Sequence, residues 1–220
     1  IGYICVRGVT HSMVRFFLIT DIHYGVNRRK KLGSQAPELL SDFTKAANQS
    51  RADFIVDMGD RVNATNKKED AHFMRKVRSA FNRLAAPVFS VIGNHDVTYL
   101  SRQDNEDIMG CPANSYSRDV GDYHLVFFNP GLELKKYGGL RLREEDLQWL
   151  ENDLESTDKK VLLFSHVPLD NQQLDDQVAL ERDGHPYISY YNRADELRGI
   201  MERSGKVVAC FSGHHHRNKH

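Results

Sequence analysis

The sequence predicts an α/β fold in one domain, and three observations lead to that prediction. Short apolar runs with the composition of buried strands alternate with amphipathic helical segments along most of the 220 residues. Two segments flank Gly121-Asp122 in the pattern of a β-hairpin, so we expect a mixed rather than a purely parallel sheet. A chain of this length is also long enough to bury a sizeable core.

The first half of the chain contains three predicted strands and two predicted helices. The strands are residues 14–20, 54–56 and 87–92, which are rich in β-branched and aromatic residues. Pro37 pre-organises the first turn of a helix, and a second helix is predicted over residues 69–84. The expected buried faces consist of Leu39, Leu40, Phe43, Ala46 and Ala47 in the first helix, and Phe73, Met74, Val77, Phe81 and Leu84 in the second.

The second half continues the alternation after the predicted hairpin of residues 116–120 and 123–128. A helix over residues 143–154, with Leu147, Leu150 and Leu154 on its buried side, precedes a strand over residues 161–164. A helix over residues 194–204 leads to the last strand, residues 207–211. Residues 101–111 and 170–192 have no clear period, and we expect both to be loops that decide substrate specificity.

Composition excludes several classes of protein. Thirty basic and thirty acidic residues cancel, so no global field draws the chain to nucleic acid or to an anionic membrane. The three cysteines, Cys5, Cys111 and Cys210, are scattered and form no CxxC pair, which favours a reduced, cytoplasmic protein over a disulfide scaffold. No apolar run approaches the roughly 20 residues that span a bilayer, and no signal-peptide pattern is found at the start.

Polar clusters follow five of the predicted strands directly. They are Asp21 with His23, Asp60, Asn94 with His95, His166, and His214 with His216. In open α/β sheets, ligands bind beyond the carboxyl ends of the strands, so we expect the five clusters to meet on one rim. In extended backbone, residues two apart face the same side, which would leave Ile22 and His215 facing away.

The chemistry of these side chains suits metal ions. Carboxylates, imidazoles and an amide, without a thiolate, favour borderline metals such as Mn, Fe, Co, Ni or Zn. Without His95, these clusters hold seven ligands, which are too many for one ion and fit two ions if one carboxylate bridges them. The turn after Gly93 makes adjacent side chains diverge, so Asn94 can face a metal while His95 faces a substrate.

In order and spacing, the motifs DxH, GDxxN, GNHD, SH and GHxH resemble those of the calcineurin-like metallophosphoesterase superfamily over residues 14–218. The resemblance implies a four-layer α/β/β/α sandwich with mixed sheets and a two-metal phosphoester hydrolase. It implies that Asp60 bridges the ions and that His95 stands beside the leaving group, where Asp96 either orients it or caps the turn. The remaining implied ligands are Asp21, His23 and His216 for one metal, and Asn94, His166 and His214 for the other.

Details of the motifs narrow the resemblance. Serine/threonine phosphatases of the superfamily carry GDxVDRG and GNHE, and purple acid phosphatases place a tyrosine where this chain has Asn63. The pairing of GNHD with GHxH is closest to small bacterial class III phosphodiesterases. Asn63 and His215 are further candidates for substrate contact, although packing is the favoured interpretation of His215.

The implied reaction is hydrolysis of a small phosphoester, with phosphodiesters favoured. Two cations about 3.5–4 Å apart neutralise the phosphoryl oxygens and lower the pKa of a bound water, and the hydroxide attacks phosphorus. His95 then protonates the departing oxygen as a general acid. The alternatives are a nuclease of the double-strand-break repair type, which the balanced charge disfavours, a phosphomonoesterase, and a non-catalytic binding module.

Three expectations concern segments outside the motifs. Because the chain opens at Ile1 and Met13 stands just before the first predicted strand, residues 1–12 are expected to be an N-terminal extension ahead of a domain of residues 13–220. Sequence leaves open whether that domain is truncated after His220, and leaves the oligomeric state open. The basic segment 28–31 could meet a substrate phosphate, but a solvated loop is the favoured interpretation.

Overall fold

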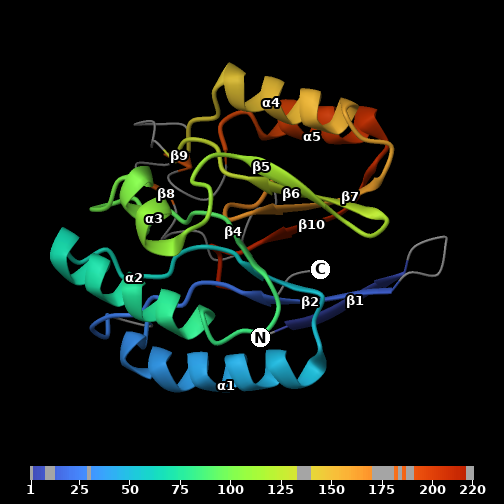
Figure 1. Ribbon diagram of the computed structural model, residues 1–220. Helices are drawn as coiled ribbons and strands as arrows, with labels where there is room; N and C mark the ends of the chain where they lie inside the picture. The colour runs from blue at the N-terminus through green and yellow to red at the C-terminus, as the bar shows by residue number, and fades with distance from the viewer. Residues whose placement is uncertain are drawn as a thin grey trace. The chain divides into compact units, whose positions relative to one another are not determined.

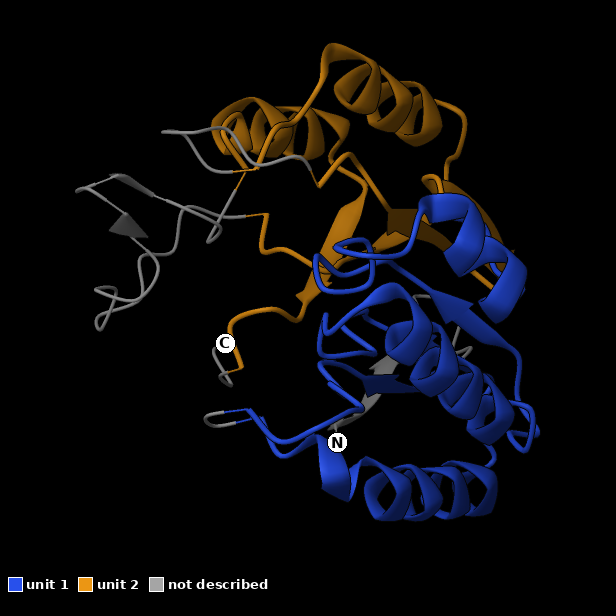
Figure 2. Ribbon diagram, turned by 90° about the vertical axis from the view of Figure 1, so that its left-hand side faces the viewer, with its two compact units in different colours: residues 1–113 blue, residues 114–220 orange. Residues whose placement is uncertain are grey.

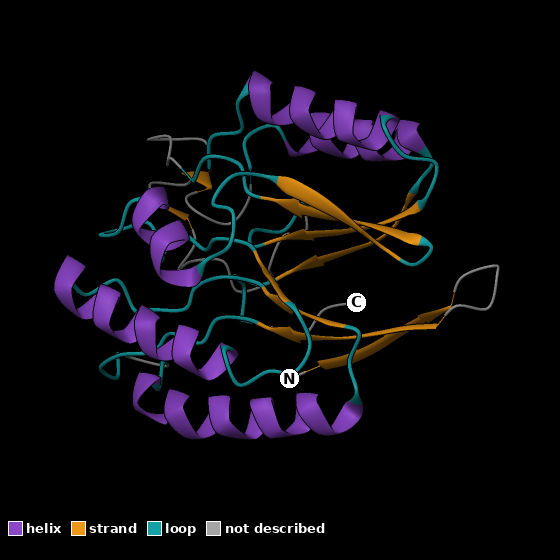
Figure 3. Ribbon diagram, viewed as in Figure 1, coloured by secondary structure: helices purple, strands orange, loops and turns teal. Residues whose placement is uncertain are grey.

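The computed structural model describes residues 2–7, 13–28, 31–132, 140–169, 181–182, 185–186 and 191–216. It divides the chain into two compact units, residues 1–113 and 114–220, coloured separately in Figure 2. Each unit contains one four-stranded sheet of mixed strand direction together with its helices (Figures 1 and 3). The predicted mixed α/β class with two sheets is therefore confirmed.

The sheet of the first unit has the order β1-β2-β3-β4. Its strands are β1 (Gly2–Arg7), β2 (Met13–Ile19), β3 (Phe54–Asp57) and β4 (Val88–Ser90). The last three are parallel, and each begins or ends within a few residues of its prediction. No strand was predicted in residues 1–12, where β1 pairs antiparallel with β2.

Helices α1 (Ala36–Ser50) and α2 (Lys67–Phe81) lie against this sheet (Figure 1), with a short 3-10 turn, η1 (Gly33–Gln35), before α1. Pro37 stands in the first turn of α1 as predicted, and Phe43 and Ala47 pack with Phe17 and Ile55 of the sheet. The predicted buried faces are too wide, because a helix buries only the stripe that meets the sheet. Leu39 and Ala46 are exposed, and Phe73 and Leu84 are only half-buried.

The expectation of a loop over residues 101–111 is wrong, since Arg102–Met109 form helix α3. The side chain of Ser101 accepts a hydrogen bond from the backbone N–H of Asp104, and Asp104 accepts from the N–H of Ser101. This capping box nucleates a helix too short and too polar to show an apolar period. Gly110, with φ of 68°, ends the helix in a left-handed conformation.

The sheet of the second unit has the order β10-β7-β6-β5. The strands β5 (Tyr116–Val120) and β6 (Tyr123–Phe128) form the predicted hairpin, and β7 (Lys160–Ser165) and β10 (Val207–Ser212) run parallel to β6. Helices α4 (Glu144–Glu155) and α5 (Ala194–Ser204) lie together on one face of this sheet (Figure 1). Within the predicted loop of residues 170–192, β8 (Glu181–Arg182) pairs with β9 (His185–Pro186), and most of the remaining residues lie outside the described ones.

Each sheet has one face packed on helices and one face lined with stacked aromatic rings. In the first unit the rings of Phe16 and Phe54 stack at 4.9 Å, with Phe89 at 6.0 Å from Phe54. In the second unit a ladder crosses all four strands, and its members in strand order are Tyr116, Phe127, Phe164 and Phe211. The ladder of the second unit supports strand register, because each of its rings pairs with the ring directly opposite on the next strand. Among the described residues, no helix is both long and apolar enough to span a bilayer.

Candidate metal centre

The segments that leave β2 and β3 run side by side and bring predicted ligands of the first unit together. The backbone N–H groups of Asp21 and His23 donate to the carbonyl oxygens of Gly59 and Asp60, both at 3.0 Å. The Nε2 atom of His23 consequently lies 3.7 Å from carboxylate oxygens of both Asp21 and Asp60. The neighbouring turn adds His95, whose backbone N–H donates to Asp60 Oδ1 at 2.8 Å. Potential ligand atoms of His23, Asp60 and His95 all lie within 4.8 Å of one another.

The backbone at these positions is left-handed. Asp21, His23 and Asp60 have φ of 52°, 47° and 55°, and in the second unit His214 and His216 have φ of 69° and 51°. These five are most of the non-glycine residues with positive φ in the described part of the chain; the others are Arg51 and Ala64. The expected extended backbone of the DxH and HxH motifs is thus wrong. Such conformations cost about 1–3 kcal/mol each and cluster where function requires a fixed geometry.

Two glycines let the turns after β3 and β4 touch. Gly59 has φ of 90°, and a Cβ there would clash with the backbone of Gly93. A Cβ on Gly93 would in turn clash with the backbone and carboxylate of Asp60. Only glycine fits either position, which explains the G in both GDxxN and GNHD.

A buried ionic network binds the same two turns. The guanidinium of Arg61 donates to Asp57 Oδ2 at 2.5 Å, to Asp96 Oδ2 at 2.9 Å and to the carbonyl of Val91 at 2.8 Å. Asp96 also accepts from the backbone N–H groups of Asp60, Arg61 and Gly93 at 2.8–3.0 Å. Of the two predicted roles of Asp96, these contacts correspond to capping of the turn.

Burial acts on the ionisation of this network. It raises the pKa of the Asp96 carboxyl to about 6; Asp60 and Asp57 add to the shift, and Arg61 opposes it. Burial likewise lowers the pKa of His23 to about 3, against the opposing pull of Asp60. His23 is therefore neutral at physiological pH, the form in which imidazole binds a metal. Neutral imidazole beside two carboxylates is a donor set that fits a divalent or trivalent metal ion.

The loop after β2 places a lysine at this cluster. Lys31 Nζ lies 2.8 Å from His95 Nε2, and the His95 ring meets the His23 ring edge-to-face at 4.8 Å. Lys31 is half-buried, so the interpretation of segment 28–31 as a solvated loop is wrong for this residue, although Arg28 is exposed. Residues 29 and 30 lie outside the described residues. Burial lowers the pKa of Lys31, while the carboxylates of Asp60 and Asp21 oppose that shift.

The asparagines of the motifs occupy different positions. Asn63 is buried, and its Nδ2 donates to the carbonyl of Val26 at 2.9 Å, which ties the loop after β2 to the exit of β3. Asn94 is half-buried in the turn between Gly93 and His95, and its backbone carbonyl accepts a hydrogen bond from Thr98 Oγ1 at 3.0 Å.

In the second unit the predicted histidines gather where β7 and β10 end. The backbone N–H of Gly213 donates to the carbonyl of His166 at 3.0 Å and joins the two exits. The rings of His166 and His214 meet edge-to-face at 5.1 Å, and His215 lies 5.4 Å from His214 rather than facing away from it. His166 is buried, His214 is half-buried and His216 is exposed.

Sequence reasoning missed the residues that hold this geometry. Arg61 and Asp57 were not singled out, although a carboxylate four residues before an arginine, next to a predicted ligand, is a signal that could have found them. Lys31 was noted only as part of a basic run. Its contact with His95 joins residues 64 positions apart, and no local pattern reports it.

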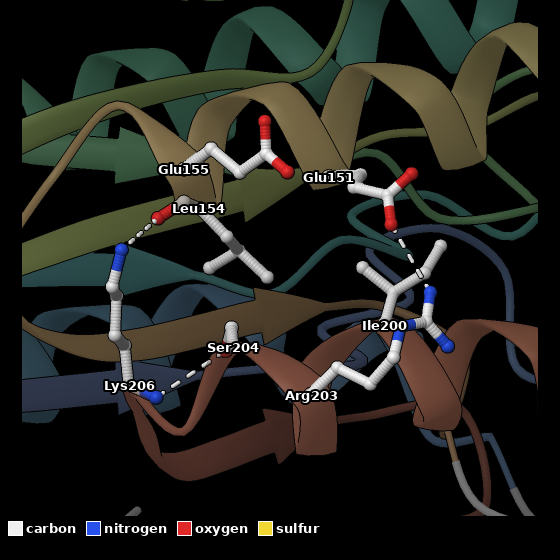
Figure 4. Close-up of a pocket in the computed structure, with 7 residues that line it drawn as sticks. All are labelled: Glu151, Leu154, Glu155, Ile200, Arg203, Ser204 and Lys206. Carbon is white, nitrogen blue, oxygen red and sulfur yellow. Dashed lines mark hydrogen bonds and ion pairs between the residues drawn. The ribbon is translucent and has the colours of Figure 1, made fainter.

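A pocket of the second unit lies away from these exits. It opens between α4 and α5 and is lined by Glu151, Leu154, Glu155, Ile200, Arg203, Ser204 and Lys206 (Figure 4). An ion pair between Arg203 and Glu151 at 3.1 Å and a bond from Lys206 Nζ to the carbonyl of Leu154 at 2.9 Å cross it. Lys206 precedes β10, whereas His214 follows it, so the pocket and the histidines stand at opposite ends of that strand.

Known proteins resemble this chain in sequence and in fold. Residues 14–218 match the model of the calcineurin-like phosphoesterase family. The chain is 25% identical over 195 residues to acid phosphatase type 7 of Mus musculus, covering 79% of this chain and 44% of that protein. It is 22% identical over 212 residues to a manganese-dependent ADP-ribose/CDP-alcohol diphosphatase of Arabidopsis thaliana, covering 74% of this chain and 65% of that protein. The chain thus spans less than two thirds of the length of either relative.

Solved structures show the same fold. A dimetal phosphatase from Danio rerio matches with a TM-score of 0.69 at 17% identity, over 91% of this chain and 81% of that one. The purple acid phosphatase PPD1 from yellow lupin matches with a TM-score of 0.61 at 12% identity, over 96% of this chain and 42% of that one. Because the family match extends over all five motifs, the chain belongs to the calcineurin-like phosphoesterase family, whose members are metal-dependent phosphoesterases that use two metal ions.

Proposed function

We propose that this protein is a dinuclear-metal-dependent phosphoester hydrolase that favours phosphodiesters. The observation that carries the proposal is the meeting of three proposed ligands, in which His23 Nε2 lies 3.7 Å from carboxylate oxygens of both Asp21 and Asp60. Left-handed backbone at five of the seven predicted ligands supports it, because a fold tolerates such strain where it fixes a site. Membership of a phosphoesterase family supports the reaction class.

The ligand roles are part of the proposal. Asp60 would hold both ions, Asp21, His23 and His216 would hold one of them, and Asn94, His166 and His214 would hold the other. The order of the motifs and the family membership support this assignment, since each unit contributes predicted ligands. When bound, the two cations would neutralise phosphoryl oxygens and provide a nucleophile from water at neutral pH.

The chain's own residues account for the remaining chemistry. His95 protonates the departing oxygen as general acid, and its backbone bond to Asp60 Oδ1 fixes its position relative to the proposed bridging carboxylate. Arg61 and Asp96 hold both turns rigid through the buried network. Asn63 positions the loop after β2 through Val26, and His215 packs on the ring of His214.

The names of two relatives indicate alternative substrates. One is called an acid phosphatase and the other a diphosphatase, so phosphomonoesters and phosphoanhydrides belong in the same assay as diesters. Small phosphoesters are the proposed substrates, and the balanced charge disfavours a nucleic acid. The resemblance of GNHD and GHxH to small bacterial phosphodiesterases supports the preference for diesters.

Metal removal tests the proposal. Hydrolysis of bis(p-nitrophenyl) phosphate should be lost with a chelator and restored by Mn²⁺ or a neighbouring divalent ion. Asp60→Asn should lower the occupancy of both ions, as measured by mass spectrometry of bound metal, whereas Asn94→Ala should mainly empty one. Asp42→Asn, on the exposed side of α1, is the matched control. Full activity of Asp60→Asn in metal-free buffer would disprove the two-metal proposal.

A further inference from the structure

Lys31 stands at an unusual place for a lysine. It is half-buried, and its ammonium group lies 2.8 Å from His95 Nε2, the nitrogen of the proposed general acid. An ammonium group has three N–H donors and no acceptor, so this contact makes Nε2 the acceptor and uses one donor. The other two donors remain for anionic oxygens on the same side of His95.

The loop that carries Lys31 is built to hold it there. The N–H and C=O groups of Arg28 and Lys31 bond to each other in both directions, at 2.8 and 2.9 Å. Asn63 anchors the loop through Val26 at 2.9 Å, and a Cβ on Gly33 would clash with the carbonyl oxygens of His23 and Gly25. The loop therefore packs directly on the segment of the predicted ligand His23, and the position of Lys31 is fixed by that packing.

The charge of Lys31 has a consequence for the leaving group. If His95 faces the departing oxygen, Lys31 is next to it and places a positive charge on the leaving-group side. An anionic oxygen is a stronger acceptor for an ammonium than a neutral imidazole, because the two opposite full charges attract each other in addition to the hydrogen bond. A leaving group with its own negative charge would draw Lys31 from His95 Nε2, and that nitrogen, once released, can take up the proton that a general acid gives to the departing oxygen.

We propose that Lys31 is a specificity-determining residue that binds an anionic oxygen of the leaving group. The site would then favour diesters of diphosphate, whose leaving group is a phosphate monoester, over phosphodiesters with an uncharged leaving group. This inference rests on the proposed function, because it places the leaving group beside His95. The reaction remains hydrolysis: water adds to the attacked phosphorus and gives up a proton to solvent, the P–O bond to the leaving group breaks, and the departing oxygen of the phosphate monoester receives a proton from His95.

Two substrates with the same attacked phosphorus test this role. One is thymidine 5′-(p-nitrophenyl phosphate), and the other is P1-(thymidine-5′) P2-phenyl diphosphate, which releases phenyl phosphate. Lys31→Met should lower kcat/KM for the diphosphate roughly 10- to 100-fold, the range expected for a lost hydrogen bond between charged groups. The same variant should change kcat/KM for the nitrophenyl ester less than about threefold, and Lys31→Arg should retain most of the selectivity.

Controls separate binding from folding and from metal loss. Lys67→Met, which removes an exposed lysine paired with Asp104 at 3.0 Å, should leave kcat/KM for both substrates unchanged. Metal content and thermal unfolding of Lys31→Met should match the wild type. The inhibition constant of phenyl phosphate should rise at least about tenfold in Lys31→Met.

The outcomes distinguish this inference from the proposed function. Equal losses on both substrates, or an unchanged inhibition constant, would show that Lys31 positions His95 or the loop and would overturn the inference alone. If the metal-loaded wild type hydrolyses neither substrate, the proposed function fails. Calorimetric titration of both proteins with phenyl phosphate then decides the role of Lys31, since equal affinities would overturn it.

Discussion

Both units contain a network of charged hydrogen bonds, but the two networks lie at opposite ends of the parallel strands. In the first unit, Arg61, Asp57 and Asp96 join the turns that follow β3 and β4, where predicted ligands are found. In the second unit, the His124 side chain lies 2.7 Å from Asp119 and 3.0 Å from Asp153. His124 stands near the start of β6, opposite the start of the parallel strand β7, whereas the predicted ligand His166 follows the end of β7.

The difference separates a network that shapes a site from one that only stabilises a fold. The turns of the first unit are held by buried charges and two obligatory glycines, whereas Gly213 of the second unit joins the exits of β7 and β10 by a backbone hydrogen bond. The strands differ in the same sense. Every residue from Phe54 to Asn63 is buried, whereas β10 alternates between half-buried and exposed residues. Substitutions in the two networks should therefore have different effects on metal binding.

The largest effect is expected at Arg61. Arg61→Met leaves the carboxylates of Asp57 and Asp96 buried without their cation, which typically costs about 3–5 kcal/mol of unfolding free energy. Metal affinity should fall as well, because the turns that carry Asp60 and Asn94 lose their common anchor. Chemical denaturation and calorimetric metal titration measure the two effects. Arg203→Met, which removes an exposed ion pair with Glu151, is the control and should cost less than about 1 kcal/mol.

The next effect is on catalysis rather than stability. His95→Ala should slow turnover by about 10²–10⁴-fold, the usual contribution of a general acid, with metal content near that of the wild type. The loss should be larger for an alkyl phosphodiester than for a p-nitrophenyl ester, because p-nitrophenolate departs without a proton. His72→Ala, on the exposed side of α2, serves as the control. Loss of metal from His95→Ala would instead identify His95 as a ligand, consistent with its distance from His23 and Asp60.

A third test uses the ionisation of His23 in the metal-free protein. Burial lowers its pKa from 6.5 to about 3, so between these values the unfolded chain binds a proton that the folded chain does not. The contribution of neutral His23 to stability is complete above pH 6.5 and is lost as the pH falls toward 3, at up to about 1.4 kcal/mol per pH unit. Denaturation of wild type and His23→Gln between pH 7 and 4 checks this. A stability difference that does not change with pH would contradict it.

The smallest effect is expected in the second network. His124→Gln removes one of two hydrogen bonds to Asp119 and Asp153 and should cost about 1–2 kcal/mol of unfolding free energy. Metal content and kcat should remain those of the wild type, since His124 lies near the amino end of β6, whereas the predicted ligand His166 follows the carboxyl end of the parallel strand β7. A fall in metal affinity comparable to that of Arg61→Met would remove the distinction between the two networks.

The sequence by itself determined the alternation of strands and helices, the hairpin at Gly121 and the five polar clusters that follow the strands. These features are local: a strand, a two-residue turn and the residue after a strand are all specified by neighbours in the chain. Helix α3 is a local feature that was not predicted, because its capping box from Ser101 to Asp104 is not accompanied by a periodic apolar face.

Only the tertiary structure decided how the cluster of the first unit is held. Asp96 accepts from the N–H of Asp60 across 36 positions, and Lys31 meets His95 across 64. The left-handed backbone of Asp21, His23 and Asp60 is likewise set by contacts between the two strand exits, since these residue types show no local preference strong enough to impose it. Periodicity records which face of an element is buried. It does not record which charged groups meet inside, because that depends on packing between segments that are distant in the chain.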